Sequence, residues 1–359
     1  MAGSKWLIYG ANGYTGALVV EEALKRGHRP VIAGRSEKKI KPVAERTGLD
    51  FVIADTNDAA SLKNALTGVD LVFNAAGPFI HTSDPVIRAC LECGVHYTDI
   101  TGEVPVFHNT FSHDKEAMQK GIVLMSGIGF DVIPTDCLAK YVAERVSRAS
   151  ELEIAFAGLT ETSPGTTKTM IEMIPNGGLV RKNGELVRSQ LGKGAKKIEF
   201  TAGTYSVMPI PWGDLETAYH TTGIPNITTY ISYPGYIISI FNAGAPLAQK
   251  LLSVKAVQQF AKKFVDMFIH GPDAEKRSKG RSYIWVQARD IKGKEAHAWL
   301  EIPDTYRFTA VASVTAIEKI LELRPKGALT PAMAFGADFV LGIEGVKRYD
   351  KLPGRHDKQ

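Results

Sequence analysis

The chain has 359 residues, of which 44% are hydrophobic and 23% are charged, and its formal net charge is +5. This composition excludes a disordered protein, a collagen and a coiled coil, and the length favours two domains. Three cysteines are too few for a disulfide framework, so we expect a reducing, cytoplasmic environment. The basic runs at 193–197 and 276–281 lack interleaved aromatic residues, so we expect no nucleic-acid partner.

The first third of the chain alternates short apolar runs with helical patterns. The pattern predicts six strands, over residues 5–9, 31–33, 51–54, 70–73, 96–99 and 122–125. The predicted helices between them cover residues 14–26, 37–47, 58–66, 85–93 and 104–119. Short strands separated by helices are typical of βαβ units, so we predict an α/β domain with a doubly wound parallel sheet.

The pattern changes after residue 126. A helix is predicted over 136–146, a strand over 152–157, a hairpin from 282–289 and 295–302, and an amphipathic helix over 306–323. We therefore predict three parts. They are a nucleotide-binding Rossmann domain (1–126), an α+β substrate or dimerisation domain with antiparallel strands (127–325), and a C-terminal segment (326–359) that packs back on the first domain.

One segment, 217–249, contains no Asp, Glu, Lys or Arg. It is rich in Ile and Tyr, but three prolines divide it, which argues against a membrane-spanning helix. We favour a buried core or an oligomer interface. The alternatives are an apolar wall of a substrate site and a surface that docks on a membrane.

A glycine-rich loop, GANGYTG, follows the first predicted strand and opens the first predicted helix. Glycines at these places permit a tight turn and a close approach of the backbone to a diphosphate, and the start of the helix supplies free N–H groups. The alternative is a simple turn at a helix start. The predicted cofactor-binding residues are Gly10, Asn12, Gly13, Tyr14, Thr15 and Gly16.

The second predicted strand ends at Gly34-Arg35-Ser36. NAD enzymes of this class place an acidic residue there, which accepts a hydrogen bond from the 2′-hydroxyl of the ribose. Arg35 cannot accept that bond, but it can pair with a 2′-phosphate and stack on the adenine. We therefore predict NADP(H) as the cofactor, with a solvent-facing arginine as the alternative.

Two further loops follow strands on the same expected edge of the sheet. Asp55, after the third strand, is predicted either to accept from the adenine amine or to cap a turn. The loop after the fourth strand has small residues, which would let the nicotinamide half of the cofactor pass close to the backbone. The predicted contacts there are Ala75, Ala76 and Gly77.

Hydride transfer also needs a proton donor for the atom that gains charge. Asp131 is the favoured catalytic candidate because it lies in the loop that joins the two domains, and Tyr97 is the second. Asp99, Glu103 and Asp136 are more simply explained as caps of helix starts. Cys137, at a helix start, is a conceivable thiol nucleophile, although packing is the commoner role.

Two absences narrow the chemistry. No Tyr is followed by Lys four positions later, so the Tyr-x-x-x-Lys pair of short-chain dehydrogenases is missing. The histidines show no spacing typical of metal ligands, so we expect no metal.

Several ordered motifs resemble the saccharopine dehydrogenase-like oxidoreductases, and among them the trans-acting enoyl reductases. The motifs are GANGYTG (10–16), GR (34–35), NAAGPF (74–79), GVHYTDITGE (94–103) and GFDVIPTD (129–136). The resemblance covers about the first 140 residues and is thinner later, at 330–331 and 334–336. Asn12 stands where the family usually has threonine, a change that should spare phosphate binding.

The resemblance implies an NADP-dependent reductase of a small molecule, with an inserted catalytic or dimerisation domain. The charge-free segment favours reduction of a C=C bond in an apolar acyl substrate. A saccharopine-type C–N oxidoreductase would need arginines aimed at carboxylates, for which Arg181, Arg188 and Arg289 are candidates. An NADP-binding regulator without chemistry is the third possibility. A homodimer is expected, and contact with a membrane surface is an open possibility.

Overall fold

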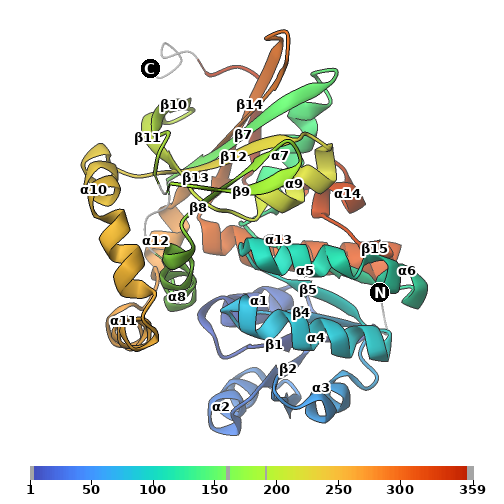
Figure 1. Cartoon of the computed structure of the whole chain (residues 1–359). Coiled ribbons are helices and arrows are strands. Elements are labelled where there is room, and N and C mark those ends of the chain that lie inside the picture. The colour runs from blue at the N-terminus through green and yellow to red at the C-terminus, as the bar shows by residue number, and fades with distance from the viewer. Residues whose placement is uncertain (1–3, 159–161, 191, 354–359) are drawn as a thin grey trace. The chain divides into compact units, whose positions relative to one another are not determined.

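The computed structural model describes residues 4–158, 162–190 and 192–353, and it divides into two compact units (Figure 1). Unit 1 comprises residues 1–133 and 306–334, and unit 2 comprises residues 134–305 and 335–359. Each unit has its own sheet. Unit 1 is therefore assembled from the two ends of the chain.

Unit 1 is built on a parallel sheet of seven strands in the order β15-β6-β5-β4-β1-β2-β3. Such central strands are covered on both faces, and β1, β4 and β5 are buried at every residue. The N-terminal part supplies β1 (Trp6–Tyr9), α1 (Tyr14–Lys25), β2 (Val31–Gly34), α2 (Glu37–Thr47), β3 (Phe51–Ile53), α3 (Ala59–Leu66), β4 (Leu71–Asn74), α4 (Phe79–Cys93), β5 (His96–Asp99), α5 (Val104–Ser112), α6 (Asp114–Lys120) and β6 (Val123–Met125). The C-terminal part supplies α13 (Thr305–Leu323), β15 (Gly327–Ala328) and α14 (Pro331–Phe335).

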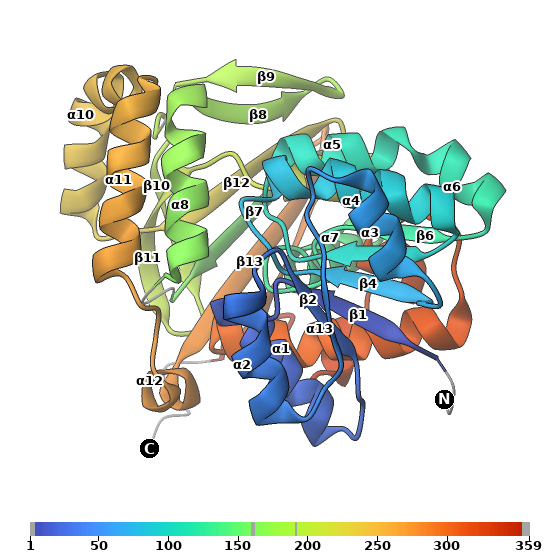
Figure 2. The ribbon, with the colours of Figure 1, turned by 90° about the horizontal axis from the view of Figure 1, so that it is seen from below.

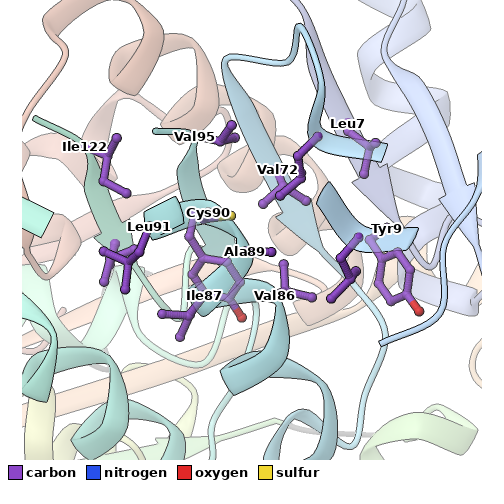
Figure 3. Close-up of a cluster of buried hydrophobic side chains, with 14 of the residues drawn as sticks. Leu7, Tyr9, Val72, Val86, Ile87, Ala89, Cys90, Leu91, Val95 and Ile122 are labelled. Atoms are coloured by element: carbon purple, nitrogen blue, oxygen red, sulfur yellow. The ribbon is translucent and has the colours of Figure 1, made fainter. Parts of the chain in front are cut away.

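A cluster of buried side chains joins this sheet to α4 (Figure 3). Leu7 and Val72 come from β1 and β4, and Ile87 and Cys90 come from α4. Burial raises the pKa of the Cys90 thiol well above its usual range. Cys93 of the same helix is exposed, and both cysteines are free.

All six strands predicted for the first unit are present, and the structure adds the two-residue strand β15. The helix predicted over 85–93 begins six residues earlier, at Phe79. Proline is favoured in the first turn of a helix, so the sequence pattern indicated a start at Pro85. The helix predicted over 104–119 is broken into α5 and α6 around His113.

Unit 2 has a mixed sheet in the order β10-β11-β12-β7-β13-β14-β16; off this path, β8 pairs with β12, and β9 pairs with β8. Only the β12–β7 pair in it is parallel among the pairs described. Its helices and short turns of helix are α7 (Ile133–Ala143), α8 (Pro164–Met173), η1 (Ile174–Asn176), α9 (Asp214–Thr222), α10 (Gly235–Leu252), α11 (Lys255–Phe268), α12 (Ala274–Lys279) and η2 (Phe339–Gly342). Its strands are β7 (Ala149–Ala157), β8 (Gly178–Lys182), β9 (Glu185–Ser189), β10 (Lys196–Phe200), β11 (Gly203–Pro209), β12 (Asn226–Ser232), β13 (Arg281–Asp290), β14 (Glu295–Pro303) and β16 (Lys347–Tyr349).

The division into units differs from the predicted domains in two ways. The second unit begins at Pro134 and not at 127, and α13 belongs to unit 1 although we placed it in the second domain. The segment 326–359 is shared. Its β15 joins the sheet of unit 1 beside β6, whereas β16 pairs with β14 in unit 2. An amphipathic pattern shows that a helix packs on a core but does not show on which core, so the sequence could not assign α13.

The charge-free segment 217–249 is divided among three elements. Thr217 and Ala218 in α9 are buried, as are Ile227 and Ile231 in β12, so this part is core. The remainder forms most of α10. No helix in the part of the chain that the structure describes is long and apolar enough to cross a membrane.

Candidate cofactor and active site

The glycine loop is held in a shape that only glycine permits at two of its positions. Gly10 has a φ of +84°, and a Cβ there would lie 2.9 Å from the amide nitrogen of Ala76. A Cβ on Gly16 would lie 2.3 Å from the carbonyl oxygen of Gly10. The loop is therefore packed tightly against both α1 and the loop after β4. A diphosphate bound there would contact main-chain atoms of the loop.

The start of α1 suits a phosphate. Gly13 is its N-cap residue and offers no side chain to the first N–H groups, and the first turn carries no acidic residue. Free N–H groups and the positive end of the helix dipole favour an anion there. Tyr14, which we predicted to contact the cofactor, packs edge-to-face on Tyr306 of α13, with 5.0 Å between ring centroids. It anchors this helix start within unit 1.

Asn12 and Arg35 lie together at the end of β2. A Cβ on Gly34 would lie 3.2 Å from the side-chain oxygen of Asn12, so the amide covers this end of the strand. Arg35 follows directly, is exposed, and has no ion-pair partner among the described residues. A free guanidinium beside the glycine loop fits the 2′-phosphate of NADP(H).

Asp55 holds its own turn. Its Oδ1 accepts hydrogen bonds from the backbone and the side chain of Asn57, at 3.0 and 3.1 Å. Ser61 accepts from the Asp55 amide at 3.2 Å. Of the two roles predicted for Asp55, these contacts favour the turn over the adenine.

The loop after β4 is fixed by Asn74, which is fully buried. Its Oδ1 accepts from the amide of Ala76 at 3.0 Å, and its Nδ2 donates to the hydroxyl of Tyr97 at 3.3 Å. Ala75, Ala76 and the cis-linked Gly77 follow, so small residues line this stretch of backbone beside the glycine loop. The arrangement leaves room for a flat ring close to the main chain.

Asp99, at the end of β5, is the centre of a buried hydrogen-bond network. Its Oδ1 accepts from the amides of Thr101 and Gly127, and its Oδ2 accepts from the hydroxyls of Tyr97 and Ser126, all at 2.8–3.0 Å. This carboxyl ties β5 to the loop after β6. Burial raises its pKa, and the four donors act against that rise.

Tyr97 lies in the core of unit 1, and its hydroxyl is used within this network. Burial raises its pKa well above the usual range. A hydroxyl that is fully buried and bonded on both sides is not placed to protonate a substrate, so the second catalytic candidate is not carried further. The cause is its position inside β5, a strand that is buried at every residue.

Glu103 clamps the start of α4. Its Oε1 accepts from the amide of Phe79 at 2.9 Å, and its Oε2 accepts from the amide of Ile80 at 2.8 Å. We expected Glu103 to support the helix that follows it, but its carboxylate satisfies the helix that lies 24 residues earlier. An anion at this helix start is favoured by the free N–H groups and the dipole.

Asp131 lies half-buried in the loop between β6 and α7. Burial, with further contributions from the carboxylates of Glu103 and Asp99, raises its pKa to about 7. The loop is held by α13, because Thr309 accepts a hydrogen bond from the Phe130 amide at 3.1 Å. Asp131 therefore carries a proton near neutral pH, at the same sheet edge as the glycine loop, which is the property of a general acid.

The other two candidates, Asp136 and Cys137, have structural roles. Asp136 accepts from the hydroxyl of Thr221 at 2.5 Å. Cys137 is fully buried, and burial raises the pKa of its thiol well above the usual range, so the structure favours the packing role over a thiol nucleophile. Within the described ranges, no group of His, Cys, Asp or Glu side chains is arranged to hold a metal ion.

The three arginines considered for a dicarboxylate substrate lie in unit 2. Arg181 pairs with Glu216 at 2.9 Å, with both side chains buried, and Arg289 pairs with Glu295 at 3.2 Å. Arg188 is exposed and lines a cavity of about 240 Å³. Two of the three guanidinium groups are thus already neutralised by acidic residues of their own unit.

Comparison with known proteins finds similarity to the N-terminal part of the first unit. Residues 6–125 match the family model described as the saccharopine dehydrogenase NADP binding domain. A lipid droplet localized protein of Caenorhabditis elegans is 34% identical over 36% of this chain. A trans-acting enoyl reductase of Mycobacterium ulcerans is 28% identical over 43%, and a saccharopine dehydrogenase-like oxidoreductase of Bos taurus is 30% identical over 39%. The matched parts cover 34–38% of the length of these relatives.

The whole chain shares its fold with a solved structure. The apo saccharopine dehydrogenase (L-Glu forming) of Saccharomyces cerevisiae superposes with a TM-score of 0.64, covering 97% of this chain and 99% of that one. The sequences are 14% identical, so this likeness concerns the fold alone. It confirms the predicted class, a doubly wound parallel sheet with a second domain that carries a mixed sheet.

Proposed function

We propose, on the premise that residues 6–125 match the model of the saccharopine dehydrogenase NADP binding domain, that this protein is an NADP(H)-dependent oxidoreductase. We infer that it reduces the C=C bond of an apolar acyl substrate. The names of two relatives refer to an enoyl group and to lipid droplets, which favours such a substrate over a dicarboxylate. The neutralised arginines Arg181 and Arg289 favour the same choice.

The loops of unit 1 fit the cofactor. The backbone that Gly10 and Gly16 bring close together would hold the diphosphate, and Arg35 would hold the 2′-phosphate. The small residues Ala75–Gly77 would lie along the nicotinamide half. When bound, NADPH supplies a hydride to one carbon of the double bond.

We propose Asp131 as the proton donor that completes the reduction, and its burial beside the carboxylates of Glu103 and Asp99 is the observation that supports this role. The second carbon of the double bond must gain a proton, and the carboxyl of Asp131 holds one at neutral pH because its pKa is raised to about 7. Glu103 and Asp99 contribute to that rise by their charge. Their roles are therefore positional and electrostatic, while the donor is Asp131.

Single-turnover oxidation of enzyme-bound NADPH tests the proposal. We expect rapid loss of NADPH absorbance with a long-chain enoyl thioester, and no loss with an α-keto acid and amino-acid pair. The rate should fall as pH rises through about 7, because the protonated form of Asp131 is the active one.

The matched variants are Asp131→Asn and, as a control, Glu45→Gln on the exposed face of α2. Asp131→Asn should keep NADPH binding and lose about 10²-fold or more in rate. Turnover only with the α-keto acid and amino-acid pair would mean that the protein is a C–N oxidoreductase. Tight NADPH binding without turnover on either acceptor would instead support a non-catalytic regulator.

A further inference from the structure

Helix α11 carries an apolar stripe on its exposed side, formed by Val257, Phe260, Phe264, Met267 and Phe268. These positions recur at helical spacing and so share one face. Phe260 is 73% exposed and Met267 is 67% exposed, and the rings of Phe264 and Phe268 stack at 4.4 Å. Scattered exposed apolar residues are ordinary, but five on one face of one helix are not.

The other side of α11 is anchored in unit 2, so the direction of the stripe is fixed. Val265 is buried, and Lys262 forms an ion pair with Glu172 of α8. Helices α8, α10 and α11 lie side by side in both views (Figures 1 and 2). Because the opposite side of α11 packs on unit 2, the stripe faces away from the core of that unit.

The apolar surface continues onto the end of α10 that leads into α11. Leu247, Leu251 and Val254 are all exposed there. The sequence analysis considered membrane docking for 217–249, but the structure buries α9 and β12 and puts the exposed apolar residues of this region on α10 and α11. The charge-free segment 217–249 therefore ends close to this apolar surface but contains few of its residues.

The charge around the stripe selects the partner. Together, α10 and α11 contain four lysines and one aspartate. Lys250, Lys255 and Lys263 are exposed. An apolar helical face with lysines at its margins matches a phospholipid surface, where the apolar side chains enter the acyl boundary and the ammonium groups meet anionic headgroups.

A second copy of the chain is a poorer partner for the same surface. A two-fold symmetric dimer places the same patch of each copy against the other. The lysine-bearing margins of the two patches would then meet, with four lysines and one aspartate on α10 and α11 of each copy. A lipid surface meets both the apolar and the cationic parts of the patch.

We propose that α11, with the adjoining end of α10, docks this protein on phospholipid surfaces that carry anionic headgroups. The helix lies in the plane of the surface and does not cross it. Phe260, Phe264 and Met267 enter the boundary between headgroups and acyl chains, and Lys255 and Lys263 bind the headgroups.

Co-sedimentation of the full chain with vesicles tests this proposal. We expect binding to vesicles of phosphatidylcholine mixed with phosphatidylglycerol, weaker binding to phosphatidylcholine alone, and a decline with added salt. For the variant carrying Phe260→Ser and Phe264→Ser, the partition coefficient into vesicles should fall by roughly tenfold or more, because two large apolar side chains no longer enter the lipid.

The control is Ile291→Ser, which removes an 88%-exposed apolar side chain at the turn between β13 and β14. It should bind vesicles as the wild type does. Lys263→Glu should weaken binding to the anionic vesicles only. Circular dichroism and NADPH binding serve as checks that each variant is folded, since both phenylalanines are exposed and their replacement spares the core.

Three outcomes would overturn the proposal. They are absence of vesicle binding by the wild type, equal binding by the double variant, and equal binding to neutral and anionic vesicles. If the double variant instead changes the molar mass measured by light scattering, the stripe is an interface between copies. None of these results depends on whether the protein reduces an enoyl group.

Discussion

Asp99, at the end of β5, and Asp131, in the loop after β6, are two buried or half-buried carboxyls. Asp99 accepts four hydrogen bonds that favour its charged form. Asp131 lies nearby in a site where burial and two other carboxylates favour its neutral form. Such a separation of environments is how one site keeps a fixed anchor and a proton donor side by side.

Replacing Asp131 should stabilise the protein while it removes the proposed activity. The pKa of Asp131 is raised in the folded chain, so its contribution to stability is full below the unfolded pKa near 4 and is lost as pH rises through about 7. Asp131→Asn does not titrate. At pH 8 we expect the free energy of unfolding of the variant to exceed that of the wild type by about 1–2 kcal/mol. This figure is kept low because Asp131 is only half-buried.

Urea denaturation of both proteins at pH 5 and pH 8 measures this difference. The gain should shrink toward pH 5, where wild-type Asp131 is protonated. A gain of the same size at both values would mean that packing, and not ionisation, separates the variants.

Arg35 should decide between the two nicotinamide cofactors. Arg35→Ala removes the guanidinium expected to pair with the 2′-phosphate, so we expect NADPH affinity to fall roughly 10- to 100-fold and NADH affinity to change little. Binding titrations with both cofactors measure the ratio. Arg46→Ala, an exposed arginine of α2, is the control and should bind as the wild type does. Unchanged affinity of Arg35→Ala for NADPH would contradict the assignment.

Part of the site was predictable because its signals are local. Gly10–Gly16 and Arg35 stand at strand ends that the sequence pattern locates directly. Thr309 and the role of Glu103 were not predictable, since they depend on contacts across 179 and 24 residues that no local pattern encodes. Burial, which decides between Tyr97 and Asp131, also emerges only when the sheet is assembled.

At the scale of elements, the turn from β1 into α1 depends on how closely two backbones approach. Gly16 lies in the first turn of α1, directly against Gly10. Gly27, just after the same helix, also has a positive φ of +82°, but an added Cβ there would meet nothing within 4 Å. Alanine at Gly16 therefore tests steric contact, whereas alanine at Gly27 tests backbone strain alone.

Gly16→Ala should be severely disruptive, whereas Gly27→Ala should be mild. At Gly16 the Cβ would overlap the carbonyl oxygen of Gly10, so we expect a loss above about 2 kcal/mol and impaired NADPH binding. Gly27→Ala should lose only about 1 kcal/mol from left-handed strain and leave binding intact. Thermal unfolding with and without NADPH distinguishes them, and equal losses would show that the loop is not tightly packed.

The secondary elements of the first unit and the β13–β14 hairpin were readable from the sequence, whereas β8–β12 and α8–α12 in the second unit were not predicted. The β13–β14 hairpin and α13 match their predicted bounds to within one residue at each end. The start of α4 was missed because Pro85 imitates a helix start, and the true start is capped by a side chain from another loop. β15 was missed because two residues carry no periodicity.

At the scale of the whole molecule, unit 1 is discontinuous, and α13 joins its two parts. Arg26, which follows α1, donates to Thr315, Glu318 and the carbonyl of Val311, all in α13. His28 also contacts Glu318 at 2.8 Å. The covering of the sheet and the Asp131 loop both require residues from the C-terminal part.

The N-terminal segment alone should therefore fail to form the cofactor site. We expect residues 1–133 by themselves to be poorly folded and to bind NADPH weakly or not at all. The same segment joined by a flexible linker to residues 306–334 should fold cooperatively and bind. Circular dichroism and NADPH fluorescence compare the two proteins, and equal binding by both would show that α13 is dispensable for unit 1.

The place of β15 at the edge of the parallel sheet bears on how the chain matures during synthesis. Until residues 327–328 leave the ribosome, the edge of β6 that β15 will occupy has unpaired backbone groups. Residues 134–305, the larger part of unit 2, are translated in that interval. The first unit to emerge is thus among the last to be completed, and the nascent protein passes through a long stage in which an open sheet edge invites association with other chains.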